Sequence, residues 1–273
     1  MSSPGDEDLE SQQGVQGPRT PLANVWPSFM EAWPPTLHGL SFRSVQIPLA
    51  EPDLLALISQ TPEARPPLEL DGRLTFSGEF RSALATALRE FPAGVFLRTG
   101  SASFKSDEFL LRPIFKAELA LKRLMLPHPR VARLASLCLH HHRPVSLFVR
   151  EWRDIPPQSE FRLFFYGRRL VAASQYHYRD LFPEIAPAAS RLAAALSAAS
   201  ARIAAALPMA QLVVDVAVTP SPASQEVVVI ETNPFGAATH AGLFTWSEIG
   251  RGDPAFRYLA HSSSGERIES IPL

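Results

Sequence analysis

The stretch that decides the fold is Val227–Gly236, "VVVIETNPFG", in which a run of β-forming residues ends on a carboxylate and an amide. Side chains two positions apart on a strand face the same side, so Glu231 and Asn233 point the same way. The preceding apolar run, "QLVVDVAVT" at 211–219, is interrupted by Asp215. If the two runs pair through the loop "PSPASQ", Asp215 lies beside the other two oxygen-bearing side chains.

Carboxylates grouped on a buried sheet are costly unless something compensates their charge. A hard divalent cation does so: Mg²⁺ takes oxygen ligands at about 2.1 Å and shares them with nucleotide phosphates. The spacing therefore indicates a metal site at Asp215, Glu231 and Asn233. The alternative at this point is that Asp215 caps a strand end and Glu231 is an exposed end residue.

The composition describes a globular chain with a substantial core. Of 273 residues, 46% are hydrophobic and 19% are charged, and 26 Lys and Arg against 27 Asp and Glu leave a net charge of −1. A near-neutral chain has no overall attraction to nucleic acid or to an anionic membrane. The single cysteine, Cys138, is expected to be a buried apolar residue. No apolar run reaches about 18 residues and no signal peptide is recognisable, so a cytoplasmic location is expected.

The order of the elements predicts an α+β protein with antiparallel hairpins and helices between them. Residues 1–24 are polar and lack apolar periodicity, which predicts a disordered tail. The aromatic residues Trp26, Phe29 and Trp33 that follow are interpreted as core anchors. Strands are expected at about 41–49, 94–100, 144–152, 159–167, 169–178, 210–219 and 226–233, and the clearest helices at about 52–60, 77–91, 128–142 and 187–207.

A second group of residues has the chemistry to bind phosphate. Arg98 and Lys105 flank the small-residue turn Thr99–Ser103, where free N–H groups and two cations suit phosphate oxygens. The Gly-Lys-Ser/Thr ending of a Walker loop is missing. A solvated basic turn is the alternative reading of this stretch.

A third group lies where an apolar strand enters a loop. Arg150 and Glu151 end the strand, and Trp152 could cover one face of an adenine whose edge meets backbone groups there. Glu160 and Arg162 share a face of the next strand, so that Arg162 can point into the same cleft. The alternative for each charged residue is a surface ion pair of about 0–1 kcal/mol.

Taken in order, these motifs resemble the cell division cycle protein 123 family, an ATP-grasp family whose eukaryotic members are ATP-binding assembly factors for translation initiation factor two. The resemblance extends from about residue 24 to 250. It rests on Trp26–Phe29, "FRSVQIPL" at 42–49, the basic pair Arg98 and Lys105, "FVREW" at 148–152, "EFR" at 160–162, Ser174–Gln175, "ETNPFG" at 231–236 and "FTWSEI" at 244–249.

The resemblance implies an ATP-grasp fold of two α+β lobes with ATP bound between them, one lobe at about 25–145 and the other at about 146–250. Residues 251–273 are then a short C-terminal tail. The implied ATP-binding residues are Arg98, Ser103, Lys105, Arg150, Glu151, Trp152, Glu160, Arg162 and Gln175. The implied Mg²⁺ ligands are Asp215, Glu231 and Asn233.

Two functions follow from this resemblance, and they stay open at this stage. One is an ATP-dependent ligase that joins a carboxylate to an amine or a similar nucleophile. The other is a non-catalytic, ATP-dependent assembly factor with a protein partner, as in the eukaryotic family. The chain has Arg98 where eukaryotic members tend to have Lys, Gly100-Ser101 where they have Asn-Trp, and Tyr176 where they have Arg. Its Pro/Ala-rich composition suits a bacterial source.

Overall fold

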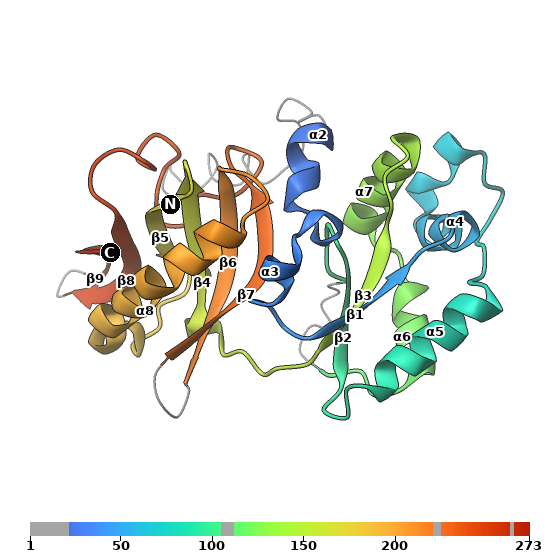
Figure 1. The fold of residues 1–273 in the computed structure, drawn as a ribbon, viewed down its shortest axis with the longest axis horizontal. Helices are drawn as coiled ribbons and strands as arrows, with labels where there is room; N and C mark the ends of the chain where they lie inside the picture. Colours follow the sequence, from blue (N-terminus) through green and yellow to red (C-terminus); the bar gives the residue numbers. More distant parts are fainter. Residues whose placement is uncertain (1–21, 105–111, 221–224, 263–264) are drawn as a thin grey trace, which may run out of the picture.

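The structure is a computed structural model that describes residues 22–104, 112–220, 225–262 and 265–273. Most of the expected disordered tail and the predicted phosphate ligand Lys105 lie outside these residues. The part of the tail that is described, from Leu22, begins the short helix α2 (Leu22–Val25). The described residues form a three-stranded and a six-stranded β-sheet, which lie side by side with α2 and α3 (Pro35–His38) between them (Figure 1).

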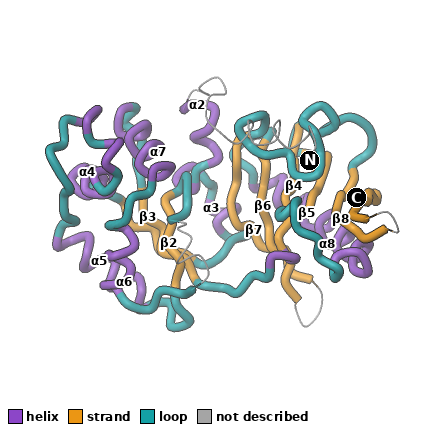
Figure 2. Tube along the Cα trace, turned by 180° about the vertical axis from the view of Figure 1, so that it is seen from behind, coloured by secondary structure: helices purple, strands orange, loops and turns teal. Residues whose placement is uncertain are grey.

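The smaller sheet has the strand order β1-β3-β2 and is antiparallel throughout. Its strands are β1 (Ser44–Pro48), β2 (Val95–Thr99) and β3 (Ser146–Glu151). The helices of this lobe are α4 (Glu51–Ser59), α5 (Gly78–Arg89), α6 (Ala117–Leu124) and α7 (Pro129–His140), which gather at one end of the molecule (Figure 2). Short 3₁₀ turns, η3 (Pro62–Ala64) and η4 (Pro66–Leu68), connect α4 to α5.

The expected lobe boundary near residue 145 lies too early. The strand after it, β3, is the central strand of the smaller sheet, because it pairs with β1 on one side and with β2 on the other. In the sequence β3 lies next to the strands of the larger lobe. Its pairing partners, β2 and β1, lie about 50 and 100 positions earlier. The connection between the lobes therefore follows Glu151.

The larger sheet has the order β7-β6-β4-β5-β8-β9. Its first four strands are β4 (Glu160–Tyr166), β5 (Arg169–Gln175), β6 (Leu212–Pro220) and β7 (Gln225–Pro234), and η5 (Pro157–Ser159) precedes β4. The predicted hairpins β4–β5 and β6–β7 are both present and antiparallel. Gly167, at φ +57°, and Arg168, at φ +60°, form the turn of the first hairpin.

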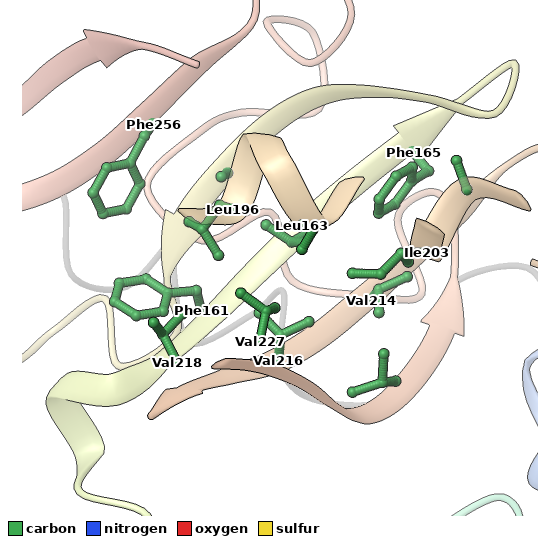
Figure 3. Packing of buried hydrophobic residues seen from close by; sticks show 14 of the residues in the cluster. Phe161, Leu163, Phe165, Leu196, Ile203, Val214, Val216, Val218, Val227 and Phe256 are labelled. Carbon is green, nitrogen blue, oxygen red and sulfur yellow. The ribbon is translucent and has the colours of Figure 1, made fainter. Parts of the chain in front are cut away.

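One face of this sheet is covered by the long helix α8 (Ile185–Ala206). Its many alanines have high helix propensity, and Pro187 sits near its start, where a missing N–H costs nothing. Leu196 and Ile203 are buried against Leu163 and the neighbouring strands (Figure 3). Because the side chains of a strand alternate, the opposite face of the same strands is left for a site.

The residues expected to form a C-terminal tail instead complete the larger sheet. The strands β8 (Ala255–Ser262) and β9 (Gly265–Pro272) form a hairpin, and β8 pairs parallel to β5. Phe256, Tyr258 and Ala260 alternate along β8 and are buried in the core under α8. This two-residue period was present in "AFRYLA" and predicts the strand once the stretch is read on its own.

Residues 22–42, here called the N-terminal strap, join the two lobes. Besides α2 and α3 the strap contains the 3₁₀ turns η1 (Trp26–Ser28) and η2 (Met30–Ala32). Phe29 and Trp33 are 6% and 5% exposed, which confirms their interpretation as core anchors. The indole N–H of Trp33 donates to Thr232 Oγ1 on β7 at 2.9 Å. The strap therefore covers the outer edge of β7, which no strand among the described residues pairs.

Candidate functional site

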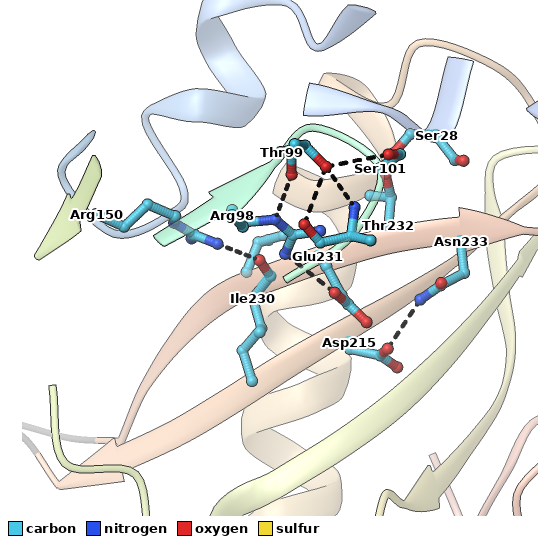
Figure 4. Close-up of polar contacts among 12 residues, drawn as sticks. Ser28, Arg98, Thr99, Ser101, Arg150, Asp215, Ile230, Glu231, Thr232 and Asn233 are labelled. Carbon is cyan, nitrogen blue, oxygen red and sulfur yellow. Dashed lines mark hydrogen bonds and ion pairs between the residues drawn. The ribbon is translucent and has the colours of Figure 1, made fainter. Parts of the chain in front are cut away.

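Three charged residues form a row across neighbouring strands, on the face of the larger sheet opposite α8. Arg162 on β4 lies opposite Asp215 on β6, and Asp215 lies opposite Glu231 on β7. Asn233 follows two positions after Glu231, and its amide group contacts Asp215 (Figure 4). The predicted juxtaposition of Asp215, Glu231 and Asn233 is therefore present in the structure.

Asp215 is held by a two-point ion pair with Arg162. The Arg162 Nε and Nη2 atoms donate to the two carboxylate oxygens at 2.8 and 2.9 Å. Asp215 is 1% exposed, and burial raises its pKa, with Glu231 and Glu160 adding to the effect and Arg162 opposing it. Burial alone would lower the pKa of Arg162, but the adjoining Asp215 carboxylate outweighs burial and raises it. Arg162 therefore carries a full positive charge at the β4 end of the row.

Glu231 is paired with a cation from the other lobe. Arg98 Nη1, at the end of β2, donates to Glu231 Oε2 at 3.0 Å, and Arg98 Nε donates to the carbonyl of Thr99 at 3.1 Å. Arg98 is 3% exposed and the Glu231 side chain 21%. This contact joins the predicted phosphate turn to the predicted metal strand, although the two are 133 positions apart in the sequence.

A cleft between the lobes is lined by residues of both sheets. The apolar residues that line it include Phe96, Ile114, Trp152 and Ile230. The polar residues that line it include five predicted site residues, Arg98, Ser103, Glu160, Asp215 and Glu231, and one that was not predicted, Tyr176. Apolar walls with a few polar groups are typical of a small-molecule site. The cleft therefore brings together residues that the sequence separated into three groups.

Arg150 has a different position from the one expected of an ATP-binding residue. It is fully buried, donates to the Ile230 carbonyl at 2.8 Å, and lies over the rings of Phe42 and Phe96 at 4.8 and 5.0 Å. Burial holds its pKa well below the usual range, and Arg98 acts in the same direction. Arg150 is not among the described residues that line the cleft, and its contacts fix β3 against β7.

The strand-to-loop exit after β3 uses its N–H groups inside the protein. The N–H of Glu151 donates to the Arg43 carbonyl at 2.9 Å, and that of Trp152 donates to the Gly94 carbonyl at 3.0 Å. The Glu151 carboxylate lies 3.7 Å from Arg153. Neither N–H is available to an adenine edge in this structure, and only the Trp152 side chain of this pair lines the cleft.

Gln175 is occupied by structural contacts. Its amide nitrogen donates to the carbonyls of His177 and Asp180, both at 2.8 Å, and its amide oxygen accepts from the Leu259 N–H at 2.8 Å. The side chain is 1% exposed. Gln175 therefore ties β5 to the loop after it and to β8, and it does not reach the cleft lining.

The structure adds Tyr176 and His240 to the surroundings of the row. The Tyr176 ring lies over the Arg162 guanidinium at 4.9 Å. Burial, and to a smaller extent the negative charges of Asp215 and Glu231, raises the pKa of the Tyr176 hydroxyl. The same two-residue alternation that predicted Arg162 could have found it. The His240 carbonyl accepts from Arg162 Nη1 at 2.8 Å. No spacing rule predicts this contact, because His240 lies in a loop.

The side-chain oxygens of Asp215, Glu231 and Asn233 suit Mg²⁺, which prefers oxygen ligands. The Asn233 nitrogen is directed to Asp215 Oδ2 at 2.9 Å, which leaves its carbonyl oxygen for a cation. Carboxylate oxygens accept more than one contact, so Asp215 and Glu231 keep acceptor capacity beside their arginines. Within the described ranges no cluster of three or more His, Cys, Asp or Glu side chains could hold a metal, so the set depends on the Asn233 oxygen.

The two lobes of mixed helix and sheet, with a cleft between them, agree with the predicted α+β fold of two lobes. The D123 family model matches residues 136–270. The chain is 31% identical over 130 residues to cell division cycle protein 123 of Eremothecium gossypii, and 31% identical over 108 residues to a translation initiation factor eIF2 assembly protein of Danio rerio. These matches cover 44% and 39% of this chain.

The matched regions span only 35% and 30% of the length of those two relatives. The solved structure of Cdc123 from Schizosaccharomyces pombe superposes with a TM-score of 0.68, over 87% of this chain and 97% of that chain, at 18% identity. The family-model match and the two relatives support a place for the chain in the cell division cycle protein 123 family, and its fold is that of the Schizosaccharomyces pombe protein. No helix among the described residues is long and apolar enough to cross a membrane.

Proposed function

We propose that the chain binds ATP together with Mg²⁺ in the cleft between its lobes. The observation that carries the proposal is a cleft lined by Glu231, Asp215 and Arg98 together with apolar side chains, in which Arg162 holds Asp215 by an ion pair. Phe96, Trp152 and Ile230 provide surfaces for a purine ring. The location proposed for this activity is the cytoplasm.

The arginines supply the charge that a triphosphate requires. Arg98 now neutralises Glu231, and on nucleotide binding its guanidinium would turn to the phosphates while Glu231 contacts the cation. Arg162 stays on Asp215 and holds that carboxylate in place by two hydrogen bonds. Glu231, Asp215 and the Asn233 oxygen are the groups that would hold Mg²⁺, which supplies positive charge beside the phosphates when bound.

The test is calorimetric titration of ATP into the full chain, with Mg²⁺ and with a chelator. Glu231→Gln is the informative variant, because it removes one charge and keeps the side-chain shape. Asp215→Ala would leave Arg162 buried without its partner and could unfold the chain. Glu226→Gln, at an exposed position of the same strand, is the matched control.

The parent is expected to bind ATP about tenfold more tightly with Mg²⁺ than without, which corresponds to about 1.4 kcal/mol. Glu231→Gln should lose this Mg²⁺-dependent gain, and Glu226→Gln should retain it. If the parent does not bind ATP at millimolar concentration, the proposed nucleotide site is wrong.

Between the two functions that such a site permits, a relative favours assembly. The Danio rerio protein that this chain matches is named as an assembly protein for translation initiation factor eIF2. We therefore propose that the chain acts as an ATP-dependent assembly factor for a protein complex. Its test is affinity capture with ATP and Mg²⁺ or without nucleotide, and a partner retained only with nucleotide and without turnover supports it.

The ligase function remains the second candidate, because Arg98 and Arg162 would also stabilise charge on a transferring phosphate. The measurement is release of ADP or AMP in a single turnover with candidate acceptors. Formation of a joined product supports the ligase. ATP binding that yields no product with any acceptor argues against it.

A further inference from the structure

We infer that Glu31, in the N-terminal strap, is the positioning residue for the turn Thr99–Ser103, and thus for phosphate binding at the proposed nucleotide site. This inference rests on the proposed function. Glu31 lies in η2 and contacts two elements outside the strap. Its Oε1 atom accepts from the Ser146 N–H at 2.9 Å, and the carboxylate also faces the N–H of Gly100.

The turn is closed by its own hydrogen bonds at its base. The N–H of Thr99 donates to the Ala102 carbonyl at 2.8 Å, and Thr99 Oγ1 accepts from the Ala102 N–H at 3.2 Å. Gly100 and Ser101 form the tip between these residues. The strap contacts the tip through Glu31 and through the Met30 N–H, which donates to the Gly100 carbonyl at 3.2 Å. Removing Glu31 therefore releases the tip while the base of the turn stays closed.

Gly100 is required by the space that Glu31 occupies. A Cβ atom at position 100 would lie 1.5 Å from Glu31 Oε2 and 2.3 Å from its Cδ. The backbone of Gly100 does not have the positive φ that would itself favour glycine. The carboxylate of Glu31 thus fills the place of a side chain at the tip of the turn. The packing therefore makes the two positions interdependent: Glu31 fits only when residue 100 has no Cβ atom.

The electrostatic setting keeps the carboxylate oriented. Burial raises the pKa of Glu31, while the N–H groups of Ser146, Glu31 itself and Gly100, together with Arg98, oppose the rise. Oε2 is buried and has no hydrogen-bond partner among the described residues. The carboxylate lies against Gly100, two positions after Arg98, the cation that the proposed function assigns to phosphate. The negative charge of Glu31 also favours the conformation of the turn in which the tip directs N–H groups, and not carbonyl groups, toward the carboxylate.

The strap reaches the metal strand as well, because Trp33 donates to Thr232 beside Glu231 and Asn233. Glu31 is two residues from Trp33, so one short segment contacts both the phosphate turn and the metal strand. We expect this segment to set the separation of Arg98 from Glu231. A change at Glu31 should therefore affect phosphate binding more than binding of the nucleoside.

The experiment compares ATP with adenosine, each titrated into the parent, Glu31→Gln, Glu31→Ala and the exposed control Glu63→Gln. Glu31→Ala is expected to weaken ATP binding by about tenfold, the loss expected for hydrogen bonds to a charged group, with less than about a twofold change for adenosine. Glu31→Gln should fall between this variant and the parent. Equal loss of ATP and adenosine, or no loss of either, would overturn the inference.

A second measurement does not depend on nucleotide. Gly100→Ala should lower the midpoint of thermal unfolding in the parent, and it should have little effect in the Glu31→Ala background, where the Cβ atom has room. Additive effects of the two substitutions would contradict the pairing of residues 31 and 100. If this coupling is present but the parent does not bind ATP, the contact stands, the proposed function fails, and the inferred role in phosphate binding fails with it.

Discussion

Trp33 provides a quantitative test of the role of the N-terminal strap. The side chain is 5% exposed, packs in the core of the larger lobe and donates from its indole N–H to Thr232 Oγ1. Replacing Trp33 by Phe removes this hydrogen bond and leaves Thr232 without its donor, which we expect to cost about 1–3 kcal/mol. Replacing it by Ala also empties the space of the ring, and the expected cost is about 3–5 kcal/mol.

The assay is urea unfolding followed by circular dichroism, which reports the loss of the whole fold. Trp26→Ala is the matched control, since Trp26 lies in the same strap but is only partly buried. A fall in the unfolding midpoint with an unchanged slope indicates lost stability. If Trp33→Ala costs no more than Trp26→Ala, the strap does not hold the lobes together and the assignment of Trp33 to the core is refuted.

Three further substitutions or modifications test other contacts. Arg162→Met should cost about 3–5 kcal/mol of stability, because it leaves Asp215 buried without its partner. The variant should gain stability as the pH falls, because a carboxyl group whose pKa is raised by folding favours the folded state when it is protonated. Urea unfolding midpoints measured between pH 5 and 8 check both effects. Cys138, whose pKa burial raises to about 12, should react slowly with iodoacetamide in the native chain at pH 8 and much faster in urea, as followed by mass spectrometry. Gly242→Ala should lower the thermal midpoint, because φ is +66° and a Cβ atom there would lie 2.5 Å from Ser174 Oγ.

Part of the arrangement of the row could be predicted because it depends on short-range rules. The two-residue period of a strand placed Glu231 and Asn233 on one face, and the short loop made β6 and β7 a hairpin. The register shift between Asp215 and Val216, which sets Asp215 opposite Glu231 instead of Ile230, has no signal in the sequence. The contact of Arg162 with Asp215 needed one more step, the pairing of β4 with β6 across the intervening helix α8. The sequence predicted Arg162 only as an ATP-binding residue and gave no sign of this contact.

The partners of Arg98, Arg150 and Gln175 could not be predicted in the same way. Each side chain bonds to groups that lie far away in the sequence or in loops, and the charge of the side chain does not say which of them it meets. Arg150 resembles a ligand-binding residue in the sequence, yet cation–π contacts with Phe42 and Phe96 place it inside the protein. The lobe boundary was missed for a similar reason, since the partners of β3 are set by the sheet and not by its neighbours in the chain.

The central claim is that Asp215, Glu231 and Asn233 hold the metal of an ATP complex between the lobes. The most direct measurement is a crystal structure of the chain grown with ATP and Mn²⁺, which replaces Mg²⁺ on oxygen ligands and gives an anomalous signal. We predict an anomalous peak about 2.1 Å from oxygens of these side chains, with the phosphates next to Arg98 and the adenine against Phe96. A nucleotide bound elsewhere, or bound in the cleft with no metal at these residues, would contradict the account.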